Sequence, residues 1–230
     1  MSETLILFDI DGTLLDTGGA GLAALREAFA DEFPDEAGRM PQLDLAGATD
    51  SGLVRNIFRH AEIDHSDHNR DRYLAAYLAR LGENLPRFGG RLLPGVGTLL
   101  ETLAAEPDVH IGLLTGNIAQ GARLKVDHFG IGHHFPFGSF GDDHHDRDQL
   151  GPIAIARARD TTGRSFSHGR TYVLGDTPKD IRCARAASVQ AVAVATGSIP
   201  RDELEQHRPD TLLDDLSDTP AVLRSLGLAS

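Results

Sequence analysis

The sequence predicts an α/β fold, with a mostly parallel sheet flanked by helices and a separate helical segment inserted after the first strand. Short apolar runs alternate with segments of helical spacing over most of the chain, which is typical of βαβ units. The stretch 18–91 interrupts this alternation, because its apolar residues recur only at helical spacing. We therefore expect a core domain made of residues 1–17 and 92–230, and a helical domain made of residues 18–91.

The strands of the sheet are expected where apolar residues form short continuous runs, since strands buried on both faces have this pattern. These runs are Leu5–Phe8, Val109–Leu114, Phe135–Phe137, Tyr172–Leu174, Gln190–Ala195 and Thr211–Leu213.

The helices of the core are expected between these runs, with right-handed crossovers. They are Val96–Ala105, Ile118–Phe129, Pro152–Thr162 and Thr177–Ala187. The inserted segment is bounded by glycine pairs at 18–19 and 89–90, and its expected helices are Leu22–Phe33, Asp50–His60 and His68–Leu85. Thr49 or Asp50 fits the N-cap of the middle helix.

Composition excludes several classes of protein. The chain has 230 residues and a net charge of −12, which argues against sequence-independent binding to nucleic acid. No apolar run is long enough to span a membrane, and no signal-like segment precedes the first strand, so a cytoplasmic location is expected. The single cysteine, Cys183, excludes an internal disulfide and is expected to be a buried apolar residue. The sequence leaves the choice between monomer and dimer open.

The most informative residues are two aspartates at the end of the first strand. Asp9 and Asp11 follow the apolar run, and Gly12 ends it. Ligands of open α/β sheets bind outside the carboxyl ends of the strands. Two carboxylates this close should raise the pKa of one of them, or a divalent cation should neutralise both. We therefore expect a functional site at this edge of the sheet, and the residues alone leave these two alternatives open.

Three further groups stand at the ends of other predicted strands. Thr115-Gly116-Asn117 follows the second strand, the loop 142–147 contains Arg147, and Gly175-Asp176 with Asp180 follows a later strand. Each group alone is a weak signal, but their order and spacing together are specific.

These motifs resemble the haloacid dehalogenase-like superfamily, which consists mostly of phosphatases. The pattern is Asp-x-Asp-Gly-Thr, a strand-end Thr, a basic residue and then Gly-Asp-x-x-x-Asp, and it extends over nearly the whole chain. The nearest likeness is to phosphoglycolate-phosphatase-like and β-phosphoglucomutase-like members. The resemblance implies a Rossmann-like core with a helical cap of the first type, in residues 18–91.

The resemblance also implies a role for each residue of the motifs. Asp9 would be the nucleophile, and Asp11 the general acid and base. Mg²⁺ would be held by Asp9, by the backbone carbonyl of Asp11 and by Asp176, with Asp180 behind them. The phosphate would be bound by Thr115, Gly116 and Asn117.

The basic residue that would contact the phosphate is open between two candidates. Most family members have Lys-Pro at this point, whereas Arg147 here lies five residues after Asp142 and no proline follows. An arginine can pair with carboxylate and phosphate through its planar fork, so Arg147 is preferred to Lys125. Weaker candidates are Thr13, which more simply shapes a turn, and Arg55 in the cap.

The expected activity is a Mg²⁺-dependent hydrolysis of a small phosphorylated metabolite, phosphoglycolate-like or a sugar phosphate, through an aspartyl phosphate. A phosphomutase would share every core residue, so this alternative stays open. A dehalogenase is less favoured, because that branch usually lacks an aspartate at the position of Asp11. A phosphonatase is excluded by the absence of any lysine before residue 125, and a non-enzymatic role is disfavoured because every acidic position is filled.

Overall fold

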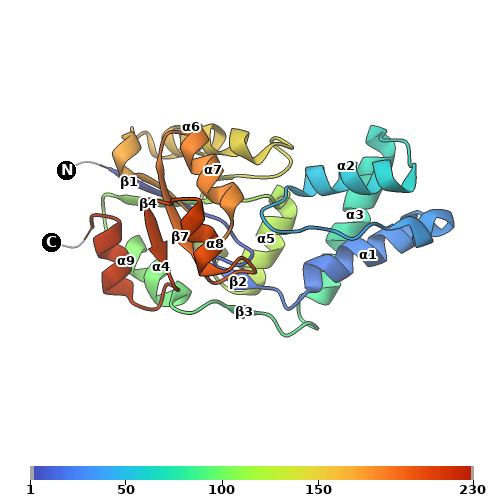
Figure 1. Cartoon of the computed structure of the whole chain (residues 1–230), viewed down its shortest axis with the longest axis horizontal. Helices are drawn as coiled ribbons and strands as arrows, with labels where there is room; N and C mark the ends of the chain where they lie inside the picture. Colours follow the sequence, from blue (N-terminus) through green and yellow to red (C-terminus); the bar gives the residue numbers. More distant parts are fainter. Residues whose placement is uncertain (1–2, 229–230) are drawn as a thin grey trace.

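The computed structural model describes residues 3–228 and consists of a central sheet with helices on both faces, next to a group of three helices (Figure 1). All neighbouring strands of the sheet run parallel, in the order β5-β4-β1-β6-β7-β8. The strands are β1 Thr4–Phe8, β4 Val109–Leu114, β5 Gly138–Ser139, β6 Thr171–Gly175, β7 Gln190–Val194 and β8 Thr211–Leu213.

Strand β1 lies at the centre because both of its faces are apolar. Ile6 and Phe8 belong to one core cluster and Leu5 and Leu7 to another, as the two-residue period of a strand requires. The first cluster lies under α4 Val96–Ala104, α5 Ala119–His128 and α9 Thr219–Ser225. The second lies under α6 Leu150–Thr162, α7 Pro178–Ala186 and α8 Arg201–Gln206.

The strand order changes direction at β1, since β4 and β5 extend the sheet on one side and β6 to β8 on the other. The chain therefore leaves a crevice at the carboxyl end of β1, which is where ligands of such sheets bind. The expected α/β fold with a parallel sheet is confirmed.

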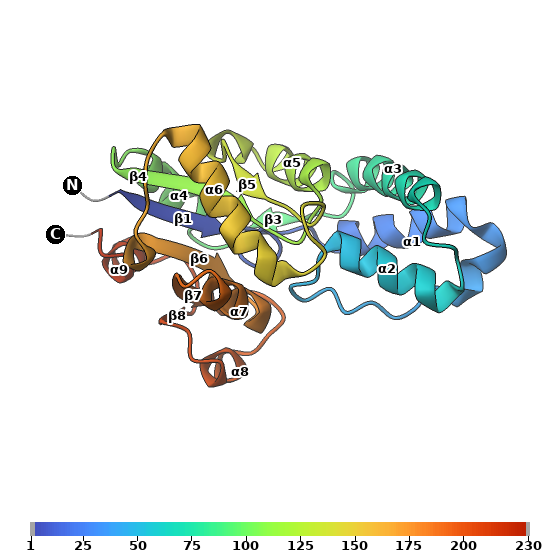
Figure 2. The same cartoon turned by 90° about the horizontal axis from the view of Figure 1, so that it is seen from above.

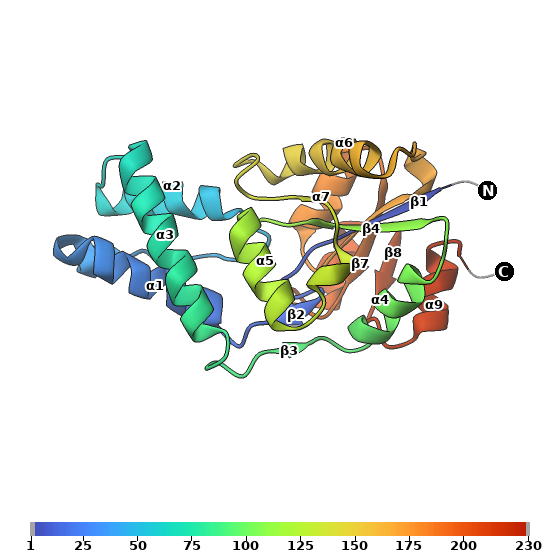
Figure 3. The same cartoon turned by 180° about the vertical axis from the view of Figure 1, so that it is seen from behind.

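Three helices form a separate group beyond that end of the sheet (Figures 1 and 3). They are α1 Ala20–Glu32, α2 Asp50–Ala61 and α3 Asp67–Asn84, and we call them the helical unit. Their apolar faces pack on one another in a third core cluster, with Phe29, Phe58 and Tyr73 at its centre. The predicted N-cap is confirmed, because the Thr49 hydroxyl accepts a hydrogen bond from the amide of Gly52.

A short antiparallel ribbon lies where the chain enters and leaves the helical unit. It pairs β2 Leu15–Asp16 with β3 Arg91–Leu92, and Figure 2 shows β3 near the carboxyl end of β1. The sequence did not predict this ribbon, because two residues are too few to show an alternating pattern.

One strand was predicted at the wrong place. The apolar run Phe135–Phe137 precedes β5, which is formed by Gly138 and Ser139. Phe135 and Phe137 pack into the clusters on opposite faces of the sheet, and only the carbonyl of Phe137 accepts a hydrogen bond from β4, from the amide of Leu113. The short helices are η1 Pro34–Arg39, η2 Gly132–His134, η3 Arg147–Gln149 and η4 His168–Arg170.

Candidate active site

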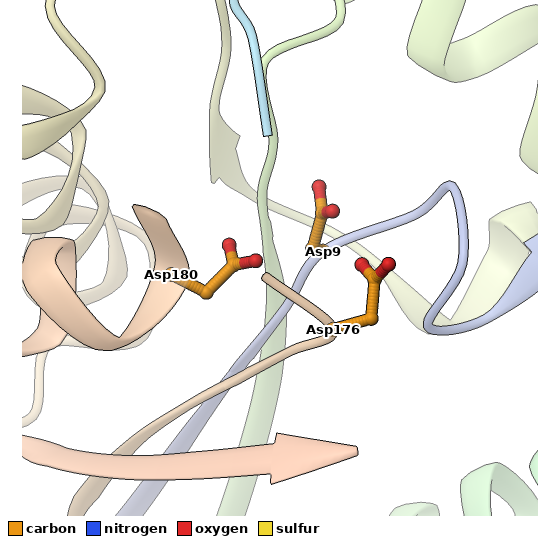
Figure 4. Close-up of side chains that lie close together, drawn as sticks. All are labelled: Asp9, Asp176 and Asp180. Atoms are coloured by element: carbon orange, nitrogen blue, oxygen red, sulfur yellow. The ribbon is translucent and has the colours of Figure 1, made fainter. Parts of the chain in front are cut away.

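Three buried carboxylates converge at the carboxyl end of β1 and β6 (Figure 4). Asp9 follows β1, Asp176 follows β6, and Asp180 lies in the first turn of α7. One oxygen of each lies within 4.8 Å of the others. Such a cluster of hard oxygen donors fits a divalent cation such as Mg²⁺.

Electrostatics supports a cation at this cluster. Burial raises the pKa of Asp9 to about 6, and Arg147 opposes this rise only in part. Burial, followed by the charges of Asp180 and Asp9, raises the pKa of Asp176 to about 8. A bound cation would favour the ionised form of both carboxylates.

The carboxylate of Asp176 is packed tightly against backbone. A Cβ placed on Gly12 would lie 2.3 Å from its Oδ2 atom, and one on Gly197 would lie 1.6 Å from the same atom. Thr13 donates a hydrogen bond from Oγ1 to Oδ1 of Asp176 at 3.3 Å. The candidate Thr13 is therefore buried beside the acidic cluster and orients one of its members.

Asp180 is held by both its helix and Arg147. Its Oδ2 atom accepts hydrogen bonds from the amide and the hydroxyl of Thr177, which completes a capping box at the start of α7. Its Oδ1 atom accepts from Nε of Arg147 at 3.1 Å. Both oxygens of Asp180 already accept hydrogen bonds within the protein. Asp180 is therefore suited to hold Arg147 and to act on a cation through its charge rather than as a direct ligand.

Arg147 connects Asp180 to Asp9. Its Nη2 atom lies 3.0 Å from Oδ1 of Asp9, and the whole side chain is buried. Burial disfavours the charge of Arg147, but Asp180 and Asp9 outweigh it, so the pKa of Arg147 is raised. A permanent positive charge therefore stands beside Asp9.

Lys125 contacts the other aspartate of the motif. From α5, its Nζ atom donates to both oxygens of Asp11, at 2.8 and 2.7 Å, and to Oδ1 of Asn117 at 2.6 Å. The Asn117 amide in turn donates to Oδ2 of Asp11. The two candidate cations thus lie on different carboxylates, Arg147 on Asp9 and Lys125 on Asp11, and Lys125 fixes the direction of the Asp11 side chain.

The loop after β4 completes the centre. Thr115 is buried, and its hydroxyl accepts hydrogen bonds from the backbone and side-chain amides of Asn117. Gly116 leaves room for the helical unit, because a Cβ there would lie 1.9 Å from the carbonyl oxygen of Ala48. A side chain at position 116 would hold the two parts of the molecule apart.

The helical unit lies directly on this loop. The Asp50 amide donates to the Gly116 carbonyl at 2.7 Å, and Oδ2 of Asp50 accepts from the amide of Ile118 at 2.9 Å. Thr49 and Ser51 donate from their hydroxyls to the carbonyls of His145 and Gly141. Three consecutive residues at the start of α2 therefore hydrogen-bond to the two loops that follow β4 and β5.

The site opens into a cavity of about 500 Å³ between the sheet and the helical unit, within the size range of small-molecule sites. Asp9, Asp11, Thr115, Gly116, Asn117, Lys125, Arg147 and Asp176 all contribute to its lining. Arg55, the weaker candidate in α2, does not. Helix α2 buries Leu53, Val54 and Ile57, so position 55 faces outward and Arg55 is exposed.

Sequence reasoning missed two groups of residues that line the cavity. Asp50 and Tyr77 come from the helical unit, and Thr196 to Ser198 come from the loop after β7. Asp50 stands at the start of a predicted helix, where its position indicates a capping residue. Tyr77 fits the apolar period of its helix, which indicates a core residue. The loop after β7 offered a usable signal, since Thr-Gly directly follows a strand. Cys183 is buried, as predicted.

A comparison with models of protein families supports the resemblance that these motifs indicate. The family model of haloacid dehalogenase-like hydrolases matches residues 6–194. The chain belongs to this family.

Several relatives cover almost all of the chain. A phosphoglycolate phosphatase of Synechococcus elongatus is 28% identical over 213 residues, 93% of each chain. The pyrophosphatase PpaX of Oceanobacillus iheyensis is 24% identical over 97% of this chain and 98% of its own. A crystal structure of β-phosphoglucomutase from Clostridium difficile superimposes with a TM-score of 0.72 at 16% identity, covering 99% and 98% of the two chains. This last likeness supports the fold of the family.

No helix within residues 3–228 combines the length and the apolar character needed to cross a membrane.

Proposed function

We propose that this protein is a Mg²⁺-dependent phosphatase that hydrolyses a small phosphate monoester through an aspartyl phosphate on Asp9. The observation that carries the proposal is the position of Asp9, which has an oxygen within 4.8 Å of oxygens of Asp176 and Asp180 and one 3.0 Å from the guanidinium of Arg147. The names of relatives, among them phosphoglycolate phosphatase and pyrophosphatase, support hydrolysis of phosphate compounds.

Asp9 would attack the phosphorus atom with one carboxylate oxygen. The bond between phosphorus and the ester oxygen breaks, and Asp11 donates a proton to the departing alkoxide. In the second half of the reaction Asp11 accepts a proton from water, that water attacks the phosphorus, and the bond between phosphorus and the Asp9 oxygen breaks. The products are inorganic phosphate and a regenerated Asp9.

The surrounding residues would bind and orient the phosphoryl group. The Thr115 hydroxyl and the backbone at Gly116 offer donors to its oxygens, and the Arg147 guanidinium neutralises part of the charge that accumulates there. Lys125 and Asn117 would keep Asp11 directed at the leaving oxygen. We propose that residues 18–91 act as a cap domain that excludes bulk water, with residues 1–17 and 92–230 as the core domain.

The donor set fits a magnesium ion. Asp9, Asp176 and the backbone carbonyl of Asp11 would hold it, with Asp180 behind them. When bound, the ion would reduce the repulsion between the anionic nucleophile and the anionic substrate.

The proposal is tested by hydrolysis of an aryl phosphate with Mg²⁺ and by substitution of the nucleophile. Asp9→Asn should abolish turnover while the fold is retained, because an amide is not a usable nucleophile. The Asp142→Asn variant is a matched control, since Asp142 is exposed and lies outside the cavity lining.

A quenched reaction with labelled substrate should show label on wild-type protein and none on Asp9→Asn. Turnover of Asp9→Asn above a few per cent of the wild-type rate would remove Asp9 as the nucleophile. Metal-independent release of chloride from a haloacid would favour the dehalogenase alternative.

A further inference from the structure

The part of the cavity wall that comes from the helical unit and from the segment before α2 is mostly apolar. The helical unit and the segment before α2 contribute to it Leu22, Leu25, Leu45, Leu53, Asp50 and Tyr77, besides glycines and alanines. No lysine or arginine of residues 18–90 lines the cavity in the described structure. Because the leaving group departs in line with the attacking carboxylate, it points away from Asp9 toward this wall.

The two polar side chains on this wall have unused hydrogen-bonding capacity. Asp50 is 7% exposed, and its Oδ2 atom accepts from Ile118, while Oδ1 has no hydrogen-bond partner within residues 3–228. Tyr77 is 1% exposed, and its hydroxyl has no hydrogen bond to any described residue. The neighbouring Tyr73, in contrast, donates to the carbonyl of Leu25. One oxygen of Asp50 and the hydroxyl of Tyr77 thus face the cavity without a hydrogen-bond partner among residues 3–228.

The charges near this wall are unfavourable to an anionic leaving group. Asp11 and Asp50 both line the cavity, and the ammonium group of Lys125 already donates to Asp11 and Asn117. Arg91 lies at the rim, where its side chain is 70% exposed and stands 3.7 Å from Asp16. A carboxylate on the leaving group would therefore meet two carboxylates and no available buried cation.

We propose that the leaving group is an uncharged alcohol carrying at least one further hydroxyl group, and that Asp50 and Tyr77 are the residues that select it. This hydroxyl would donate to the free oxygen of Asp50 and accept from the phenol of Tyr77. This inference rests on the proposed phosphatase function and narrows its substrate class. It disfavours phosphoglycolate, whose leaving group carries a carboxylate.

The test compares two substrates that share a two-carbon chain, 2-hydroxyethyl phosphate and 2-phosphoglycolate. With the full chain and Mg²⁺, kcat/KM for 2-hydroxyethyl phosphate should exceed that for 2-phosphoglycolate by roughly 10- to 100-fold. An aryl phosphate measured beside them reports the phosphatase function itself. If the aryl phosphate is hydrolysed and 2-phosphoglycolate is the better of the two matched substrates, the inference is overturned and the phosphatase function stands. If none of the three is hydrolysed, the proposed function fails.

Asp50→Asn removes the charge and keeps an oxygen that can accept from Ile118. This variant should reduce the preference for 2-hydroxyethyl phosphate by about 10-fold, mainly by improving turnover of 2-phosphoglycolate. Asp142→Asn is the matched control, because Asp142 accepts a hydrogen bond from the next amide of the same helix, that of Ala119, yet does not line the cavity. The control should leave the preference unchanged, and an unchanged preference in Asp50→Asn would refute the role of Asp50.

Tyr77→Phe provides a second test that is independent of Asp50. It should lower kcat/KM for 2-hydroxyethyl phosphate and leave ethyl phosphate, which lacks the second hydroxyl, unaffected. A merely structural role would lower both substrates equally, and that result would refute recognition by Tyr77.

Discussion

The raised pKa of Asp176 predicts that the metal-free protein loses stability as the pH rises. Burial, with the charges of Asp180 and Asp9, raises the folded-state pKa of Asp176 to about 8, whereas an unfolded aspartate titrates near pH 4. Between these values the folded chain binds a proton that the unfolded chain has lost. The free energy of unfolding must therefore decrease with rising pH across this window.

The slope can reach about 1.4 kcal/mol per pH unit for one such group. From pH 5 to pH 8 the loss should thus be on the order of 4 kcal/mol, a large share of the stability of a typical domain. Asp176→Asn should abolish most of this loss, because the amide keeps the acceptor for Thr13 and carries no charge. At pH 8 without metal, the variant should be more stable than the wild type.

The assay is urea unfolding in the presence of a chelator at pH 5, 6, 7 and 8. Asp142→Asn serves as the control and should follow the wild type, because Asp142 is exposed and lies outside the acidic cluster. Addition of Mg²⁺ at pH 8 should restore stability to the wild type, since the ion binds only the folded carboxylates. A wild-type stability that is constant or rises from pH 5 to pH 8, or an equal loss in Asp176→Asn, would refute the reasoning.

Three further predictions concern activity and the contacts of the helical unit. Arg147→Ala should lower kcat by about 100-fold or more, as measured by steady-state kinetics. Arg147→Lys should recover only part of this kcat, because an ammonium group cannot contact Asp9 and Asp180 together as the planar guanidinium does. A fully active Arg147→Lys would argue against a role of the guanidinium geometry. Ca²⁺ in place of Mg²⁺ should bind but support little turnover, because its larger and looser coordination shell misplaces the attacking oxygen; equal rates with the two ions would contradict this. Ser51→Ala removes the hydrogen bond to the Gly141 carbonyl and should raise KM more than it lowers kcat. The control Ser66→Ala, at the N-cap of α3, should change neither KM nor kcat. Equal effects of the two substitutions would show that the contact of α2 with the core does not matter.

The sequence was sufficient to predict the sheet and the strand ends, because these depend on local patterns. Asp9 directly follows a continuous apolar run, Asp176 follows another after Gly175, and parallel strands bring their carboxyl ends to one edge. The strand at Phe135–Phe137 was misplaced because apolar residues indicate burial and do not reveal which backbone groups pair. The ribbon of Leu15–Asp16 with Arg91–Leu92 is too short to give a pattern.

The carboxylate partners of Lys125 and Arg147 could not be predicted from the sequence, because they depend on where each side chain lies in the folded structure. Lys125 lies eight residues after Asn117, and only the orientation of α5 brings its ammonium group onto Asp11. The distance from Arg147 to Asp9 likewise depends on the course of a loop and on the capping box that fixes Asp180. The predicted catalytic roles of these residues stay predictions until the variants are measured.

The close approach of Gly116 to Ala48 has a consequence for how this chain can change. Position 116 lies in the loop after β4 and position 48 in the segment before α2. These two segments are far apart in sequence but in contact, so the size of the residue at position 116 restricts where residue 48 can lie. A single added methyl group would overlap the carbonyl oxygen of Ala48 unless that segment moved away. An alanine at position 116 should therefore be tolerated only together with a compensating change in the segment 45–49, and the two positions should vary as a pair rather than one at a time.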